Sequence, residues 1–171
     1  MKLKYRIYQA ILLILYIGLM VFFIIMCKES GNKSSLSSQK VATVTANVIN
    51  TVSGKDVVSS DSESFQRFVR KFVGHFSYFV ALGSVSILFW LSITEINRFI
   101  RIIIHYSIGI LFAIVSEFLL EGTTKGRGPS WSDVMLDSFG FIMLSTIIVL
   151  IYYFIYLKSK NSKKLQDWIF L

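Results

Sequence analysis

Two pairs of carboxylates interrupt an otherwise apolar part of this sequence. Glu117 and Glu121 stand four residues apart. Asp133 and Asp137 repeat that spacing, and Arg127 lies in the turn between the two pairs. Because residues four apart share one face of a helix, each pair presents its carboxylates together. Carboxylates gathered beside a guanidinium could hold an anionic ligand, transfer protons, or only pair with one another.

A basic face precedes these acids in the sequence. Arg67, Lys71 and His75 recur every four residues, with Arg70 beside them. Arginine and lysine near the end of an apolar helix often only extend to the lipid headgroups. His75 lies about one turn inside the apolar run, where an ionisable group usually faces protein or water. We therefore interpret His75 as part of a site.

The composition indicates that membrane-spanning helices position these residues. The chain has 171 residues, of which 54% are hydrophobic, and its mean hydropathy is +0.62. A helix needs about 20 apolar residues to cross a bilayer, and the stretches long enough are residues 7–27, 72–91, 102–120 and 134–157. Because backbone groups must be paired in lipid, the sequence predicts an all-α fold. We expect a multi-pass four-helix bundle in the cell membrane, forming a single domain over residues 1–171.

The first of these stretches follows a basic N-terminus and could instead be a signal peptide. Its apolar run exceeds the roughly 7 to 15 residues of a signal core. No small-residue cleavage pattern follows it. We therefore interpret residues 7–27 as a retained helix.

Lysines and arginines predict the orientation of the bundle. The two termini and residues 92–101 together carry nine basic and two acidic residues, a net charge of +7. The remaining nine basic and eight acidic residues give the other side +1. Because short loops dense in lysine and arginine stay in the cytoplasm, we predict cytoplasmic N- and C-termini, with residues 28–64 and 122–132 outside. No nucleic-acid-binding motif accompanies the positive charge, so the expected partners are membrane lipids and not nucleic acid.

The serine-rich segment of residues 28–64 has two interpretations. It contains no proline and has the composition of a flexible or partly ordered extracellular loop. Within it, Val41, Val44 and Val48 share one helical face, which favours a short amphipathic helix on the outer membrane surface. The pattern supports the two interpretations equally.

The predicted helix ends bring the charged residues to one outer rim of the bundle. Each charge left alone in hydrocarbon would cost about 3 kcal/mol, so mutual pairing or a water-filled cleft is expected. We predict one outward-facing polar site, with His75 and Glu117 as candidates for acid and base. The predicted binding residues are Arg70, Lys71, Glu121, Arg127, Asp133 and Asp137.

The same residues resemble the VanZ-like family of bacterial membrane proteins. The segment "RKFVGHFSYFVALG" at residues 70–83 is similar to a family segment that contains Arg-Lys, His-Phe and Leu-Gly at these spacings. The resemblance continues with Glu117, Arg127 and Asp133, and with "DSFG" at residues 137–140.

Two positions depart from the family's pattern. Glu121 stands where the family has glutamine, and Asp137 stands where it has asparagine, so this site is more acidic. The motifs cover residues 65–157, whereas the first helix and the serine-rich loop match by layout. The resemblance implies a polytopic protein of Gram-positive bacteria, associated with teicoplanin-type glycopeptide resistance or cell-envelope processes.

Three function classes stay open on the sequence. The site could bind an anionic or lipid-linked envelope component through Arg70, Lys71 and Arg127. It could instead be an enzyme site in which His75 and Glu117 act as acid and base on a lipid-linked substrate. The charges could also form ion pairs that fix the helix packing and bind nothing.

The sequence predicts neither a cofactor nor a metal. The segment "GRGPS" lacks the lysine and spacing of a phosphate-binding loop. A zinc site needs about three or four ligands. His75 and His105 are the only histidines, and we expect them toward opposite ends of the bundle.

Overall fold

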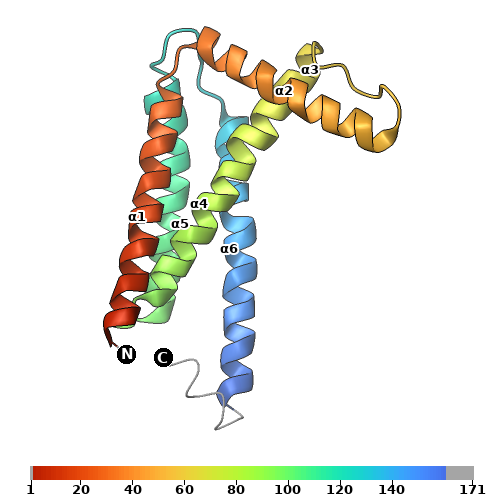
Figure 1. The fold of residues 1–171 in the computed structure, drawn as a ribbon. Helices are drawn as coiled ribbons and strands as arrows, with labels where there is room; N and C mark the ends of the chain where they lie inside the picture. Colours follow the sequence, from red (N-terminus) through yellow and green to blue (C-terminus); the bar gives the residue numbers. More distant parts are fainter. Residues whose placement is uncertain (1, 161–171) are drawn as a thin grey trace.

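The computed structural model describes residues 2–160, and every regular element in that range is a helix (Figure 1). In chain order the elements are α1 (Lys2–Cys27), α2 (Gly31–Ser53), α3 (Glu63–Val69), η1 (Arg70–Phe76), α4 (Ser77–Ser92), α5 (Arg98–Val115), η2 (Ser116–Glu121) and α6 (Trp131–Lys160). The elements η1 and η2 are π-helical; η1 joins α3 to α4, and η2 extends α5. The all-α prediction is confirmed for the described residues.

Four helical rods are long and apolar enough to cross a membrane: Leu3–Cys27, Glu63–Ser92, Arg98–Glu121 and Trp131–Lys158. Each of the four predicted stretches lies inside one of them. The rods extend past the apolar stretches because polar residues can continue a helix once its backbone hydrogen bonds are started. These helices indicate a membrane protein, as the composition predicts.

The four rods lie alongside one another, and α2 lies across one end of them (Figure 1). At that end, which we call the α2 end, lie α2, α3 and the connection from η2 to α6. The start of α1 and the connection from α4 to α5 lie at the opposite end, the α4–α5 end. That the α2 end faces outward, with both termini cytoplasmic, stays a prediction. Three residues counted in the predicted cytoplasmic charge lie outside the described residues: Lys163, Lys164 and Asp167.

Small residues let α4 and η1 approach α6 closely. A Cβ on Gly83 would lie 2.3 Å from the carbonyl oxygen of Phe141, and one on Gly140 would lie 2.7 Å from that of Phe76. Close backbone contact is how helices pack in lipid, where apolar side chains gain little by leaving the surrounding tails. This contact sets the polar residues of η1 opposite those of α6.

An aromatic core lies next to the polar residues. The ring of Phe23 in α1 lies 5.1 Å from that of Phe79 and 5.9 Å from that of Phe112, measured between centroids. Phe23 also meets the ring of His75 edge-on at 6.0 Å. The imidazole therefore has an apolar neighbour on one side, and the carboxylates described below on the others.

Residues 31–53, within the serine-rich segment, form the helix α2. Its small residues Ser34, Ala42 and Ala46 are buried. The valines that the sequence places on one face are exposed: Val41, Val44 and Val48. The position of α2 on an outer membrane surface stays a prediction.

Candidate functional site

Two of the rods change from α to π geometry where their polar residues lie. In η1 the amide of Ser77 donates to the carbonyl of Phe72, and in η2 the amide of Gly122 donates to the carbonyl of Glu117 at 2.8 Å. Such turns, with hydrogen bonds between residues five apart, are rare and occur frequently at functional sites. The two wider turns carry His75 on one rod and Glu117 on the other, and both side chains are buried.

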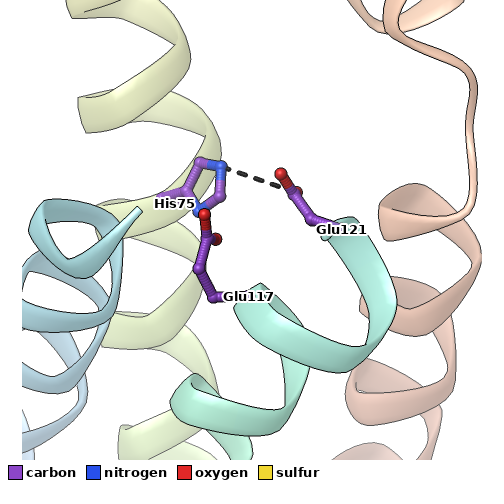
Figure 2. Close-up of side chains that lie close together, drawn as sticks. All are labelled: His75, Glu117 and Glu121. Carbon is purple, nitrogen blue, oxygen red and sulfur yellow. Dashed lines mark ion pairs between the residues drawn. The ribbon is translucent and has the colours of Figure 1, made fainter. Parts of the chain in front are cut away.

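His75, Glu117 and Glu121 point toward one another from these two turns (Figure 2). One side-chain nitrogen of His75 and one oxygen of each glutamate lie within 4.8 Å of one another. Nε2 of His75 is 3.8 Å from Oε1 of Glu121. All three residues are at most 6% exposed. Groups that can ligate a metal or move a proton are thus gathered away from water.

Asp137 of α6 holds the other ring nitrogen of His75. Its Oδ2 lies 3.3 Å from Nδ1 of His75, and Asp137 is fully buried. Its second oxygen, Oδ1, has no hydrogen-bond partner within residues 2–160. A carboxylate on Nδ1 fixes the orientation of the imidazole and leaves Nε2 directed at Glu121.

Two arginines share Glu121. Nη1 of Arg127 lies 2.6 Å from Oε1 of Glu121, and Nη2 of Arg70 lies 3.4 Å from Oε2. The Arg127 side chain is 6% exposed and also donates to the carbonyl oxygen of Cys27 and to the hydroxyl of Ser34. The Arg70 side chain is 40% exposed. Arg127 therefore ties the turn to α1 and α2, whereas Arg70 is accessible at the edge of the cluster.

Lys71 and Asp133 form the outer edge of the cluster. Nζ of Lys71 lies 2.6 Å from Oδ1 of Asp133 and 2.9 Å from Oγ of Ser132. The Lys71 side chain is 41% exposed and that of Asp133 is 10% exposed. The ion pair therefore lies between the buried carboxylates and the surroundings.

Glu117 and Asp137 differ from Glu121 and Asp133 because no lysine or arginine that the structure describes forms an ion pair with either of them. Oε1 of Glu117 accepts a hydrogen bond from the amide of Ser130 at 2.7 Å, and Glu117 is 1% exposed. Within the described residues the cluster has four carboxylates and three permanent cations. It therefore carries one excess negative charge when His75 is neutral.

The structure brings all eight predicted site residues into one cluster: Arg70, Lys71, His75, Glu117, Glu121, Arg127, Asp133 and Asp137. Arg67, on the same predicted face, lies outside it in an exposed ion pair with Glu63. His105 is also separate, because its Nδ1 lies 3.0 Å from the hydroxyl of Ser86 in α4. What the cluster binds stays a prediction.

Three serines of the cluster were not predicted: Ser34, Ser130 and Ser132. Ser130 and Ser132 link Glu117 to Asp133 through hydrogen bonds. Single serines in a serine-containing turn give no signal of that role. For Ser34, the recurrence of small residues at every fourth position of α2 could have indicated a packed face.

A cavity of about 410 Å³ lies beside the cluster. Its polar side is formed by Arg70, His75, Glu121 and Arg127. Its largely apolar wall comes from α1 and the rod of α3, η1 and α4: Phe22, Phe23, Met26, Val69, Val73 and Tyr78. Residues of α2 complete the lining: Ser34, Ser37, Ser38 and Val41. The cavity therefore joins a charged end to an apolar wall.

No protein-family model, curated protein or solved structure matches this chain. Its function is therefore inferred from the chemistry of the site. A cavity with guanidinium groups at one end and apolar side chains along the wall suits an amphiphilic anion. The imidazole and the two glutamates of Figure 2 are a set that suits a cation.

Proposed function

We propose that this chain is a VanZ-like protein of the Gram-positive cell membrane. Its outward-facing site would bind an anionic, lipid-linked component of the cell envelope. Through that binding it would contribute to teicoplanin-type glycopeptide resistance or to related envelope processes. The family and the resistance role rest on the sequence resemblance, and the observation that carries the kind of ligand is the cavity, which sets two guanidinium groups beside an apolar wall. A small soluble anion would make no contact with the apolar wall, and a neutral lipid would form no ion pair with the guanidinium groups.

Arg70 is the residue best placed to bind the anionic headgroup. Its contact with Glu121 is long, at 3.4 Å, and its side chain is 40% exposed. A guanidinium has five N–H donors in a planar fork, so most of them are left for a phosphate or carboxylate. Arg127 adds positive charge at the same end of the cavity, although its donors are largely engaged. Lys71 lies at the outer edge, where it would attract the same ligand.

The apolar wall supports a lipid-linked ligand. Phe22 of α1 and Val73 of η1 line the cavity and are also 53% and 46% exposed. The wall therefore continues onto a surface of the rods that faces lipid in a membrane. A hydrocarbon chain could lie along this surface while its headgroup reaches Arg70.

Two features support an outward-facing site. The charge difference between the two sides of the sequence favours a cytoplasmic α4–α5 end. The exposed valines of α2 are typical of a helix that lies in a membrane interface, and the charge difference favours the outer one. In that position α2 would cover the site from outside and leave access from the lipid side.

An enzyme acting on a lipid-linked substrate is the second candidate. His75 is held by Asp137 on one ring nitrogen and faces Glu121 with the other, and Glu117 lies in the same cluster. This is the arrangement of an acid or base that is oriented by a neighbouring carboxylate. Glu117 has no lysine or arginine partner among the described residues, so it could exchange a proton without breaking an ion pair.

Binding of a lipid phosphate tests the first candidate directly. The purified protein in zwitterionic lipid nanodiscs, kept in a metal chelator, should bind polyprenyl phosphate and not the matching polyprenol. Arg70→Gln should weaken that binding at least about tenfold, because it removes charge-assisted hydrogen bonds. Arg67→Gln is the matched control, since Arg67 pairs only with the exposed Glu63. Equal binding of the phosphate and the alcohol would contradict the proposal.

The resistance phenotype tests the wider claim. Arg70→Gln and Glu117→Gln should each abolish the contribution to teicoplanin resistance while membrane abundance stays normal, whereas Arg127→Ala should lower abundance as well, because it removes a buried ion pair. Glu63→Gln should change neither quantity, because that carboxylate is exposed and remote from the cluster. If the abundance of Arg70→Gln or Glu117→Gln falls together with resistance, the charges serve packing instead. Unchanged resistance at normal abundance would rule out these residues as the functional site.

A further inference from the structure

We propose that His75, Glu117 and Glu121 bind a divalent transition-metal ion, Zn²⁺ or Mn²⁺, at the buried end of the cavity. One nitrogen and two carboxylate oxygens lie within 4.8 Å of one another (Figure 2). Two ligands of one tetrahedral ion lie about 3.4 Å apart, because each is about 2.1 Å from it. Side-chain rotations that move the ligand atoms by about an ångström would therefore close the site.

The surroundings of His75 match those of a metal-bound histidine. A histidine ligand usually donates its second ring N–H to a carboxylate, which fixes the tautomer and makes the ligating nitrogen more basic. Asp137 occupies that position, with Oδ2 3.3 Å from Nδ1 of His75. Nε2 then faces Glu121, at 3.8 Å from its Oε1.

The charges of the cluster favour a bound cation. Glu117 is 1% exposed and has no lysine or arginine partner in the described part of the chain. Oδ1 of Asp137 is buried and likewise lacks a hydrogen-bond donor among residues 2–160. An uncompensated carboxylate is costly in a buried site, and a divalent ion compensates it directly.

The arginines on Glu121 leave room for the ion. A carboxylate has about four acceptor positions, two on each oxygen. Arg127 uses one position on Oε1, and Arg70 approaches Oε2 at 3.4 Å. The remaining positions of Glu121 are available to a metal, so the guanidiniums flank the ion without replacing it.

The ligand set indicates the kind of metal and its open coordination position. Imidazole favours zinc and other transition metals over magnesium and calcium, and carboxylates extend the choice to manganese. Three protein ligands leave one or more positions for water or a substrate oxygen. His75 and Glu121 both line the cavity, so the open position faces it. The metal and Arg70 would then bind the same anionic headgroup from two sides.

Metal binding by the full chain in zwitterionic nanodiscs, with no lipid phosphate present, tests this site. After chelator treatment and dialysis, the wild-type protein should take up about one Mn²⁺ per chain, the number expected for one closed ligand set. The electron paramagnetic resonance of bound Mn²⁺ should show coupling to a histidine nitrogen. Zn²⁺ should compete for the same site and remove that signal.

Variants separate the ligands from their surroundings. Asp137→Asn should weaken Mn²⁺ binding about 10- to 100-fold, the usual effect of losing a carboxylate behind a histidine ligand. Glu117→Gln should weaken it at least as much, whereas Glu63→Gln, on the exposed end of the same rod as His75, should not change it. Uptake by the wild-type protein, with its nitrogen coupling, answers the question even if a variant fails to fold.

Two results would overturn the metal site. The first is that the folded wild-type chain takes up no Mn²⁺ or Zn²⁺ in stoichiometric amount. The second is that bound Mn²⁺ shows no nitrogen coupling and binds Glu117→Gln with the same affinity as the wild-type chain. Because lipid phosphate binding is measured in chelator and metal uptake without lipid phosphate, the two proposals fail separately.

Discussion

The two ends of the bundle each contain a buried histidine and a buried arginine side chain, and they differ in what those side chains contact. At the α2 end, His75 lies between Asp137 and Glu121, and Arg127 pairs with Glu121. The charges there belong to one network that borders a cavity. His105 belongs to the half of the bundle that leads to the α4–α5 end, where it meets neutral partners.

The partners of His105 and Arg101 are those of a packed interior. His105 is fully buried, with its Nδ1 3.0 Å from the hydroxyl of Ser86 and its ring stacked on that of Phe141 at 4.6 Å. Arg101 donates to the carbonyl oxygens of Trp90 at 3.2 Å and of Leu91 at 2.8 Å. Those carbonyls lie in the last turn of α4, where carbonyls run short of intrahelical donors, and that of Trp90 also accepts from the amide of Ile93 at 3.4 Å.

The comparison shows that burial of an ionisable residue does not by itself indicate a site. Arg101 donates to carbonyls at the end of a helix and His105 stacks on a ring, and neither has an ionised partner, although Nε of Arg101 and Nε2 of His105 lack hydrogen-bond partners among the described residues. His75 and Glu117 lie among other ionisable groups whose charges do not balance when the imidazole is neutral. A functional role is therefore inferred from the partners of a buried group.

Replacing each histidine by phenylalanine should give the largest difference between the two ends. His75→Phe should lower the free energy of unfolding by about 3 to 5 kcal/mol, because Asp137 then lies buried without a partner. His105→Phe should change it by about 1 kcal/mol or less, since one hydrogen bond is lost while the stacking on Phe141 is kept. Unfolding in detergent, followed by circular dichroism, measures both.

A double variant sharpens this result. Adding Asp137→Leu to His75→Phe should recover most of the lost stability, because an apolar pair can replace a buried ionic pair at little cost. If the two single histidine variants lose equal stability, or if the double variant recovers nothing, the contrast between the ends is wrong.

Replacing Arg101 or Arg70 by methionine should give effects of intermediate size. One variant should change the free energy of unfolding, and the other should change ligand binding. Arg101→Met keeps most of the side-chain volume but removes two part-buried hydrogen bonds from a charged group to carbonyls, so it should cost about 1.5 to 3 kcal/mol. Polyprenyl phosphate binding per folded molecule should stay unchanged. Arg70→Met should do the reverse, with a stability change within about 1 kcal/mol, since its ion pair is partly exposed. Loss of binding in Arg101→Met would show that the two ends are coupled.

Lys71→Gln should have the smallest effect on stability. Its ion pair with Asp133 is short, but the Lys71 side chain is 41% exposed, so the loss should be at most about 1 kcal/mol. Thermal unfolding beside Arg67→Gln, whose ion pair is more exposed, provides the matched reference. A loss as large as that of Arg101→Met would place Lys71 in the buried network instead of at its edge.

Much of the site could be predicted because charge in an apolar sequence is a strong signal. His75 stood out as an ionisable group inside an apolar run, and the spacing of Glu117 and Glu121 put both on one helix. With only two histidines, the sequence predicted no zinc site. That two glutamates lie near His75 could not be predicted, because a contact between separate rods leaves no mark in the residue spacing of either one.

The sequence by itself determined the four apolar rods, since the need to pair backbone groups in lipid leaves helices as the way to cross it. It also determined that the charges gather near one set of helix ends. Only the tertiary structure decided which charge meets which. The close approach of Gly83 and Gly140 to the neighbouring backbone sets η1 against α6, and the π turns place His75 and Glu117 inside the bundle. These contacts change when one packed helix shifts against another by about an ångström. Hydrophobicity and residue spacing, in contrast, specify the ends of a helix only to within one or two residues.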